Sequence, residues 1–281
     1  MSERALPNNI LLDFSNRKLL SPVPKKLYKS AKTYFSKREL ELLKTAYNVA
    51  FQAHKEQLRK DGSQYITHPV AVASILIELN LDIETVCAGL MHDVLEDSFI
   101  QKKYLEKLFG KDIVAIVDGV SNLNKLDFES IEDRNANNLQ KMALAMSKDI
   151  RVIIVKLCDR LHNMRTIEFL PREKQINKSL ETLDLYGPIA IRIGMQNIRV
   201  ELEDLAFQCL HPMRARMLTS AIKQAVGGRQ KIISKLRKQF KYYLKNNEIP
   251  AIVQGRQKSL YSIYKKIKDK KKPFSQILDV Y

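Results

Sequence analysis

The twelve residues Cys87–Ser98, CAGLMHDVLEDS, place an imidazole and three carboxylates at the end of an apolar run. His92 and Asp93 are adjacent, and Glu96 and Asp97 follow about one helical turn later. Residues four apart share a helix face, so His92 stacks above Glu96 and Asp93 above Asp97. Crowded carboxylates repel one another and are costly to bury unless a cation neutralises them. The stretch therefore indicates either a metal site in a helical core or a solvated acidic helix end.

Two distant segments favour the metal site. The segment YITHP puts His68 at the start of a helix, because Pro69 suits the first helical turn. The segment KLCDRLHNMRT puts Asp159 directly after the apolar run RVIIVKLC, where an unpaired carboxylate would be expensive. Together with His92 and Asp93, these residues form a His2Asp2 set that suits Mn²⁺, with Fe²⁺ or Zn²⁺ as alternatives. The spacing H…HD…D resembles that of HD-type metal-dependent phosphohydrolases.

Nearly all the periodicity in the chain is helical, and glycine is scarce, with 9 residues. Ser36, followed three residues later by Glu39, is a capping-box pattern that begins a predicted helix over residues 36–59. Further helices are predicted over residues 82–98, 104–123 (as two short helices), 135–147, 149–167 and 180–212. Short strands are predicted over residues 250–255 and at the C-terminal end. The predicted fold class is mainly α: an all-helical bundle, then a helical linker and an incomplete α/β segment.

The sequence becomes strongly cationic after His211-Pro212. Residues 213–248 read as a long cationic helical stretch, split near Gly227-Gly228. The expected organisation is an N-terminal segment, an HD-type hydrolase domain, a helical linker and a truncated nucleotidyltransferase-like part, over residues 1–24, 25–200, 201–225 and 226–281.

Charge and cysteine content restrict the function further. Lys and Arg outnumber Asp and Glu by 48 to 31, which gives a net charge of +17 and favours an anionic partner. The apolar region 70–91 is interrupted by acidic residues, so we expect no membrane span. Cys87, Cys158 and Cys209 lie in apolar, helix-like runs without a CxxC pair, which predicts reduced thiols in a cytoplasmic protein.

Several blocks in a fixed order resemble the long RelA/SpoT-homologue alarmone synthetase/hydrolases. The blocks cover about residues 25–281 and are RKDGSQYITHP, AGLMHDVLEDS, FGKDIVAIVDGVSNL, KMALAMSKDIRVIIVKLCDRLHNMRT, YGPIAIRIGMQNIRVELEDLAFQCLHP and GRQKSLYSIYKKI. The resemblance implies an all-helical HD domain that removes the 3′-pyrophosphate from guanosine tetra- or pentaphosphate in the stringent response. The products would be GDP or GTP and pyrophosphate.

The resemblance also implies roles for individual residues. The Mn²⁺ ligands would be His68, His92, Asp93 and Asp159. The residues that orient and deprotonate the attacking water would be Glu96 and Asp97. The nucleoside pocket would include Asn163, which is also counted with the catalytic residues, and Thr166. The base and the phosphates would be contacted by Arg59, whose guanidinium can stack on a purine, and by Lys60. His162 and Arg165 are expected to be supporting residues, and no catalytic role is expected for His54 or His211.

The C-terminal block resembles only the opening of the family's synthetase domain. The residues similar to its ATP-binding segment are Gly255, Arg256, Lys258, Ser262 and Lys266, and Asp279 resembles its first magnesium-binding aspartate. The chain stops at Tyr281, so we expect it to be truncated and to lack synthetase activity. Ribosome binding is not expected either, because the family's C-terminal regulatory regions are missing.

Two alternatives stay open from the residues alone. One is an HD phosphohydrolase that acts on another nucleotide or on a nucleic acid end. The other is a regulatory module that binds alarmone without turnover. The sequence fixes neither the metal, nor the preference between tetra- and pentaphosphate, nor the oligomeric state.

Overall fold

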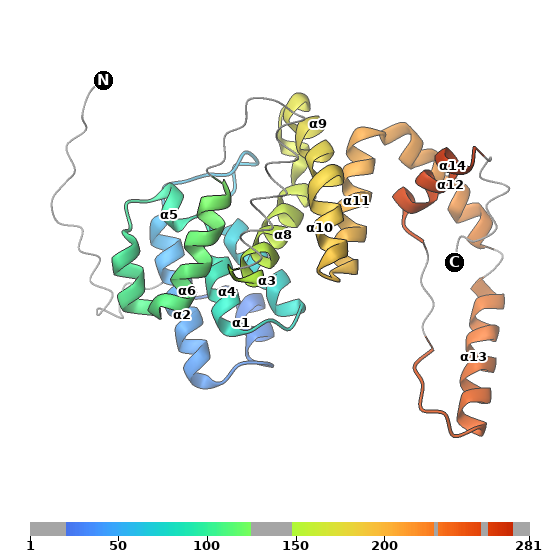
Figure 1. Cartoon of the computed structure of the whole chain (residues 1–281), viewed down its shortest axis with the longest axis horizontal. Helices are drawn as coiled ribbons and strands as arrows, with labels where there is room; N and C mark the ends of the chain where they lie inside the picture. The colour runs from blue at the N-terminus through green and yellow to red at the C-terminus, as the bar shows by residue number, and fades with distance from the viewer. Residues whose placement is uncertain (1–20, 125–147, 228–229, 254–257, 272–281) are drawn as a thin grey trace. The chain divides into compact units, whose positions relative to one another are not determined.

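The computed structural model describes residues 21–124, 148–227, 230–253 and 258–271 (Figure 1). Every regular element in these ranges is helical, which confirms the predicted all-helical fold. The chain divides into two compact units, Met1–Lys125 and Leu126–Tyr281. No helix in the described ranges is long and apolar enough to cross a membrane. The predicted helix over residues 135–147 lies outside the described residues.

The first unit is a helical bundle built around α4. Its helices are α1 (Lys25–Ala31), α2 (Lys37–Ala53), α3 (Thr67–Glu78), α4 (Ile83–Met91), α5 (Val94–Asp97) and α6 (Lys102–Asn124). Eight of the nine residues of α4 are buried, as expected for a helix with apolar residues on all sides. It packs against α2, α3 and α6. The helix that leads to His92 is therefore the centre of this unit's core.

Several predicted helix boundaries are confirmed. The Ser36 hydroxyl accepts the Glu39 amide, and the Glu39 carboxylate accepts the Ser36 amide, which completes the predicted capping box of α2. Within α6, Gly110 has a φ of 81°, so the element is two helices that meet at a kink, as predicted. Glycine suits this position because L side chains rarely adopt positive φ.

Two other boundaries differ from the prediction. α2 ends at Ala53 instead of continuing to Arg59, because residues 58–64 form a tight turn with Gly62 at a φ of 82°. The single helix predicted over residues 82–98 is wrong: α4 ends at Met91, His92 caps it, and α5 begins at Val94. Amphipathic periodicity continues through the break, so the pattern alone could not reveal it.

Close packing of α3 on α4 depends on Gly89. A Cβ atom placed there would lie 2.3 Å from Cδ1 of Leu76, which is fully buried on α3. The absent side chain lets these two helices approach closely. α3 carries His68 and α4 leads directly to His92, so this contact fixes the spacing of two predicted metal ligands.

The second unit is organised around α11. Its elements are α8 (Ile150–Arg165), η2 (Ile167–Phe169), α9 (Arg172–Glu181), η3 (Thr182–Tyr186), α10 (Gly187–Arg192), α11 (Gln196–Leu210), α12 (Pro212–Gly227), α13 (Gln230–Asn246) and α14 (Leu260–Lys270). α11 packs against α8, α9 and α10, and also against α12 and α14. The division of the cationic stretch into α12 and α13 agrees with the predicted split near Gly227.

α14 is fastened to α11 and α12 by an apolar cluster and by one carboxylate. Phe207 and Ile263 are fully buried in the cluster, and Tyr264 stacks on Phe207 with ring centroids 4.7 Å apart. The Asp204 carboxylate accepts the backbone amides of Leu260 (3.3 Å) and Tyr261 (2.9 Å). A negative charge at a helix N-terminus also favours the helix dipole.

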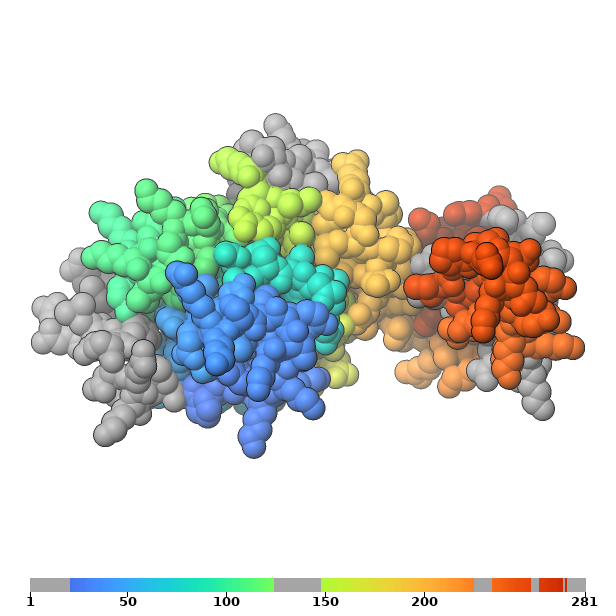
Figure 2. Space-filling view, turned by 90° about the horizontal axis from the view of Figure 1, so that it is seen from below, coloured from blue at the N-terminus to red at the C-terminus, as the bar shows by residue number. Residues whose placement is uncertain are grey.

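α13 is largely exposed, and Figure 2 shows it in orange at the surface of the second unit. Its outward side chains include Phe240 and Tyr243. The strand predicted over residues 250–255 is wrong for its described part, because Pro250–Val253 forms no strand. A strand needs a partner edge, and no other strand lies within the described ranges to provide one. The second predicted strand lies outside those ranges.

Gly89→Ala should lower the free energy of unfolding by about 1–3 kcal/mol, because the new methyl group forces Leu76 out of a fully packed position. Chemical denaturation monitored by circular dichroism would measure this change. Ser74→Ala, on the same helix as Leu76, serves as the control. Equal stabilities for wild type and Gly89→Ala would refute the close-contact explanation.

Asp204→Ala should loosen α14 by about 1–2 kcal/mol, because two amides at its start lose a charged acceptor. Hydrogen exchange of the amides in residues 260–270 should then be about ten-fold faster or more. Asp269→Ala, which removes an exposed carboxylate of α14, should leave the exchange unchanged. Unaltered protection in Asp204→Ala would contradict this role of the carboxylate.

Candidate metal and nucleotide site

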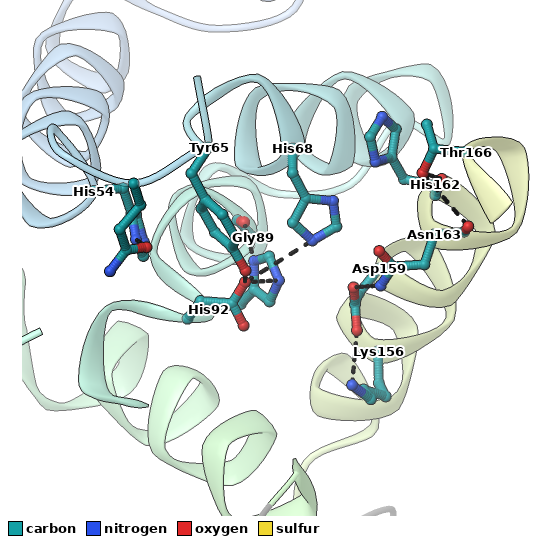
Figure 3. Close-up of polar contacts among 12 residues, drawn as sticks. His54, Tyr65, His68, Gly89, His92, Lys156, Asp159, His162, Asn163 and Thr166 are labelled. Atoms are coloured by element: carbon teal, nitrogen blue, oxygen red, sulfur yellow. Dashed lines mark hydrogen bonds and ion pairs between the residues drawn. The ribbon is translucent and has the colours of Figure 1, made fainter. Parts of the chain in front are cut away.

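The first unit places its proposed ligands at the start of α3 and at the α4–α5 break. His68 is the second residue of α3, as predicted, and is buried. His92 is fully buried, and Asp93 beside it is 8% exposed. The two imidazoles meet edge to face, with ring centroids 5.1 Å apart (Figure 3). The local fold therefore brings together three of the four residues predicted to hold a metal.

The Asp93 carboxylate faces both imidazoles. Its Oδ2 lies 3.0 Å from Nε2 of His92 and 3.9 Å from Nε2 of His68. The Tyr65 hydroxyl donates a hydrogen bond of 2.7 Å to the same oxygen. These contacts give Asp93 a fixed orientation inside the core.

The hydrogen bonding of His92 suits a metal ligand. Its Nδ1 lies 2.9 Å from the carbonyl oxygen of Gly89, and a carbonyl can only accept, so the proton is on Nδ1. Nε2 of the neutral ring then carries a lone pair and faces the Asp93 oxygen, which is also an acceptor. Two facing acceptors are stabilised by a cation near both of them. Metal-bound histidines commonly donate their other N–H to a carbonyl in this way.

Glu96 and Asp97 lie on α5, just beyond Asp93. Their backbone amides donate to the Asp93 carbonyl at 3.1 and 2.9 Å, which holds this short helix against the break. Partial burial and the negative charge of Asp93 raise the pKa of Asp97 above its usual range. A divalent cation beside Asp93 would act in the opposite direction.

The second unit supplies Asp159, which is buried on α8. The Lys156 ammonium donates to its Oδ2 at 2.7 Å, and the Asn163 amide donates to its Oδ1 at 2.6 Å. Burial lowers the pKa of Lys156, but the charges of Asp159 and Tyr186 more than compensate, so the net pKa lies above its usual range. These two donors hold both carboxylate oxygens of Asp159 in a fixed orientation.

The other predicted residues of α8 have separate partners. Thr166 caps the helix, and its hydroxyl donates to the His162 carbonyl at 3.1 Å. Arg165 makes a paired contact with Glu201 of α11 at 2.6 and 2.9 Å, which agrees with its expected supporting role.

Arg59 and Lys60 lie in the turn between α2 and α3. The Arg59 amide donates to the Ser63 carbonyl, and the Gly62 amide donates to the Arg59 carbonyl, at 2.8 and 3.0 Å. Lys60 is exposed and Arg59 is half-buried. Both cations thus precede His68 on an ordered turn.

The predicted synthetase-like residues are only partly described. Gly255, Arg256 and Asp279 lie outside the described ranges. Lys258 precedes α14, while Ser262 and Lys266 lie on it. The Ser262 hydroxyl takes part in the N-terminal cap of α14, 2.8 Å from the Ser259 hydroxyl.

Three residues beside the predicted ligands were missed or dismissed from the sequence. Tyr65 precedes His68 by three residues, and Lys156 precedes Asp159 by three, so helical spacing could have indicated both. His54, for which no catalytic role was expected, is buried, bonds Gln57 through Nδ1 at 2.9 Å and packs on the Tyr65 ring. These contacts join residues that are not neighbours in the sequence.

The donor types fit a divalent metal. His68 and His92 in the first unit and Asp159 in the second are all buried and are all of donor types that bind divalent metals. Imidazole and carboxylate donors accept Mn²⁺, Fe²⁺ and Zn²⁺ alike, so this set indicates a divalent cation without selecting one.

The cysteines do not contribute donors. Burial raises the pKa of the Cys87 and Cys158 thiols, which keeps them protonated and unreactive. All three cysteines are unpaired, as expected.

Comparison with known proteins gives an independent result. A family profile described as HD domain matches residues 46–196, more than half of the chain. A Vibrio cholerae protein named guanosine-3′,5′-bis(diphosphate) 3′-pyrophosphohydrolase is 45% identical over 251 residues, or 89% of this chain and 36% of that protein. The Escherichia coli protein named bifunctional (p)ppGpp synthase/hydrolase SpoT is 45% identical over 249 residues, 89% of this chain and 36% of its own length.

A third relative has a different printed name. A Mycobacterium leprae protein named probable GTP pyrophosphokinase is 40% identical over 266 residues, which cover 95% of this chain and 34% of that protein. This chain therefore spans about a third of the length of the relatives it matches.

Lys156→Met should destabilise the protein by about 3–5 kcal/mol, because it leaves Asp159 buried without its cation. Denaturant unfolding would measure the loss. Lys174→Met, at an exposed position on α9, is the matched control and should change stability by less than about 0.5 kcal/mol. Mn²⁺ should restore part of the loss if it neutralises Asp159. A loss no larger than that of the control would show that the ion pair is not needed.

Proposed function

Because this chain belongs to the HD domain family, we propose that it hydrolyses guanosine 3′,5′-bis(diphosphate), or the corresponding pentaphosphate, at its 3′-pyrophosphate. The products are GDP or GTP and pyrophosphate. The observation that carries the proposal is that the buried residues His68 and His92 both face the Asp93 carboxylate. Nε2 of His92 lies next to that carboxylate, while its Nδ1 bonds the Gly89 carbonyl. Relatives named for this reaction match 89% of the chain at 45% identity, which supports the choice of substrate.

The proposed cofactor is Mn²⁺, held by His68, His92, Asp93 and Asp159. When bound, such an ion lowers the pKa of a coordinated water toward neutrality. The chain's own contribution is to orient the ligands: the Gly89 carbonyl accepts the Nδ1 proton of His92 and so turns Nε2 toward Asp93. Asn163 and Lys156 hold the Asp159 carboxylate in a fixed orientation.

Glu96 and Asp97 are the proposed water-handling pair. Their backbone amides are bonded to the Asp93 carbonyl, so the backbone of both residues keeps a fixed position relative to Asp93. A base in this position accepts a proton from the attacking water and returns it to the leaving group. Glu96 is half-buried and Asp97 is exposed, which leaves them reachable by solvent and substrate.

Arg59, Lys60, Asn163 and Thr166 are the proposed substrate contacts. A guanidinium can stack on the guanine base, and a lysine offers a compact charge to phosphate. The net charge of +17 favours encounter with a highly anionic nucleotide. The proposed setting is the cytoplasm, where reducing conditions keep thiols such as Cys87 free.

The direct test incubates the protein with guanosine tetraphosphate and Mn²⁺ and separates the nucleotides by ion-exchange chromatography. Wild type should release GDP and pyrophosphate, and a chelator should stop the reaction. Binding of the nucleotide without product would instead support the alarmone-binding module. Release from other nucleotides at equal rates would support a broader phosphohydrolase.

Asp93→Ala should reduce turnover by at least about a thousand-fold, because it removes both a proposed ligand and the acceptor for Tyr65. Calorimetric titration of the metal-free variant should also show weaker Mn²⁺ binding than wild type. Asp112→Ala removes an exposed carboxylate from α6 in the same unit and should retain wild-type values. Wild-type turnover in Asp93→Ala would exclude Asp93 from the site.

A further inference from the structure

Tyr65 lies between two carboxylates to which the proposed function gives different tasks. Its hydroxyl donates to Oδ2 of Asp93 at 2.7 Å, and the side chain of Asp97 lies near enough to interact with the same hydroxyl. Asp93 is a proposed metal ligand and Asp97 a proposed water-handling group. One hydroxyl is therefore the common neighbour of both carboxyl groups.

The ring of Tyr65 is held by two imidazoles. His54 packs on it with centroids 4.7 Å apart and planes inclined by 33°. His68 meets it edge to face, at 6.0 Å and 77°. His54 is 1% exposed, so the ring is supported on that side by a fully buried group.

Gln57 connects His54 back to the acidic pair. Its side-chain amide nitrogen donates to the backbone carbonyl of Asp97 at 3.0 Å, which fixes the amide orientation and leaves Oε1 as an acceptor. That oxygen lies 2.9 Å from Nδ1 of His54, so Nδ1 carries the proton. Asp97 is thus connected to the packed rings of His54 and Tyr65 in two ways. Its side chain interacts with Tyr65, and its backbone carbonyl accepts from Gln57, which in turn bonds His54.

We propose that Tyr65, held by His54 and Gln57, is a positioning residue that fixes the Asp97 carboxyl relative to Asp93. The inference rests on the proposed function and deepens it. A phenylalanine would fill the same space against His54 and His68, so a merely structural Tyr65 would tolerate that change. A positioning Tyr65 would not, because its hydroxyl donates its one proton to Asp93 and is also the group of Tyr65 that interacts with the Asp97 side chain.

The experiment compares Tyr65→Phe and Gln57→Met with wild type. Tyr65→Phe should lower kcat by about 10–100-fold and weaken Mn²⁺ binding by about ten-fold, as losses of groups that orient metal ligands do. KM should stay within about twofold, because no substrate contact is removed. Gln57→Met keeps the side-chain length but loses both hydrogen bonds, and it should lower kcat in the same direction by a smaller factor.

Tyr47→Phe is the matched control. Tyr47 is a buried tyrosine of α2 in the same unit, with its ring against Phe51 and remote in sequence from the acidic pair. Its variant should keep kcat and Mn²⁺ affinity within about twofold of wild type. Thermal unfolding of every variant separates loss of fold from loss of positioning.

The outcomes separate this inference from the proposed function. Wild-type kcat and Mn²⁺ affinity in Tyr65→Phe overturn the inference and leave the proposed function standing. An equal loss in Tyr47→Phe also overturns it. If wild type releases no product, the proposed function fails, and calorimetry still decides the inference: ten-fold weaker Mn²⁺ binding in Tyr65→Phe supports it, and unchanged binding overturns it.

Discussion

Burial of carboxylates is the constraint on which the rest of the structure depends. Asp93 and Asp159 are each almost fully enclosed, and a charge removed from water costs several kcal/mol unless donors or a cation replace the lost hydration. In each unit, nearby donors offset the lost hydration. Tyr65 donates to Asp93, and Lys156 and Asn163 donate to Asp159. The surrounding buried apolar residues make the enclosure possible.

The parts of the fold that follow local rules could be predicted from the sequence. A capping box begins α2, a proline in the first turn begins α3, and a glycine divides α6, each through interactions within a few residues. His68, His92 and Asp159 stood out for the same reason, since each polar residue adjoins an apolar run. Their burial matches that expectation.

What the sequence could not predict depends on contacts between distant segments. The end of α4 at His92 interrupts a pattern that reads as one continuous helix, because the local chain turns Asp93 toward Tyr65. His54 had no visible partner along the chain, yet it packs against a ring eleven residues later. The sequence does not show that Gly89 must lack a side chain, because that requirement comes from Leu76 on another helix. Periodicity carries no information about such neighbours.

Two acidic residues of α11 connect it to both α8 and α14. Glu201 holds Arg165 at the end of the helix that carries Asp159, and Asp204, three residues further on, holds the first amides of α14. Two residues one turn apart on α11 therefore hold both α8, which carries Asp159, and α14. Suppose that a ligand bound at Asp159 shifts α8 and thereby changes the docking equilibrium of α14. Because thermodynamic linkage is reciprocal, the docking of α14 then changes the affinity for that ligand by the same factor. Glu201 and Asp204 would then couple the position of α8 to the docking of α14.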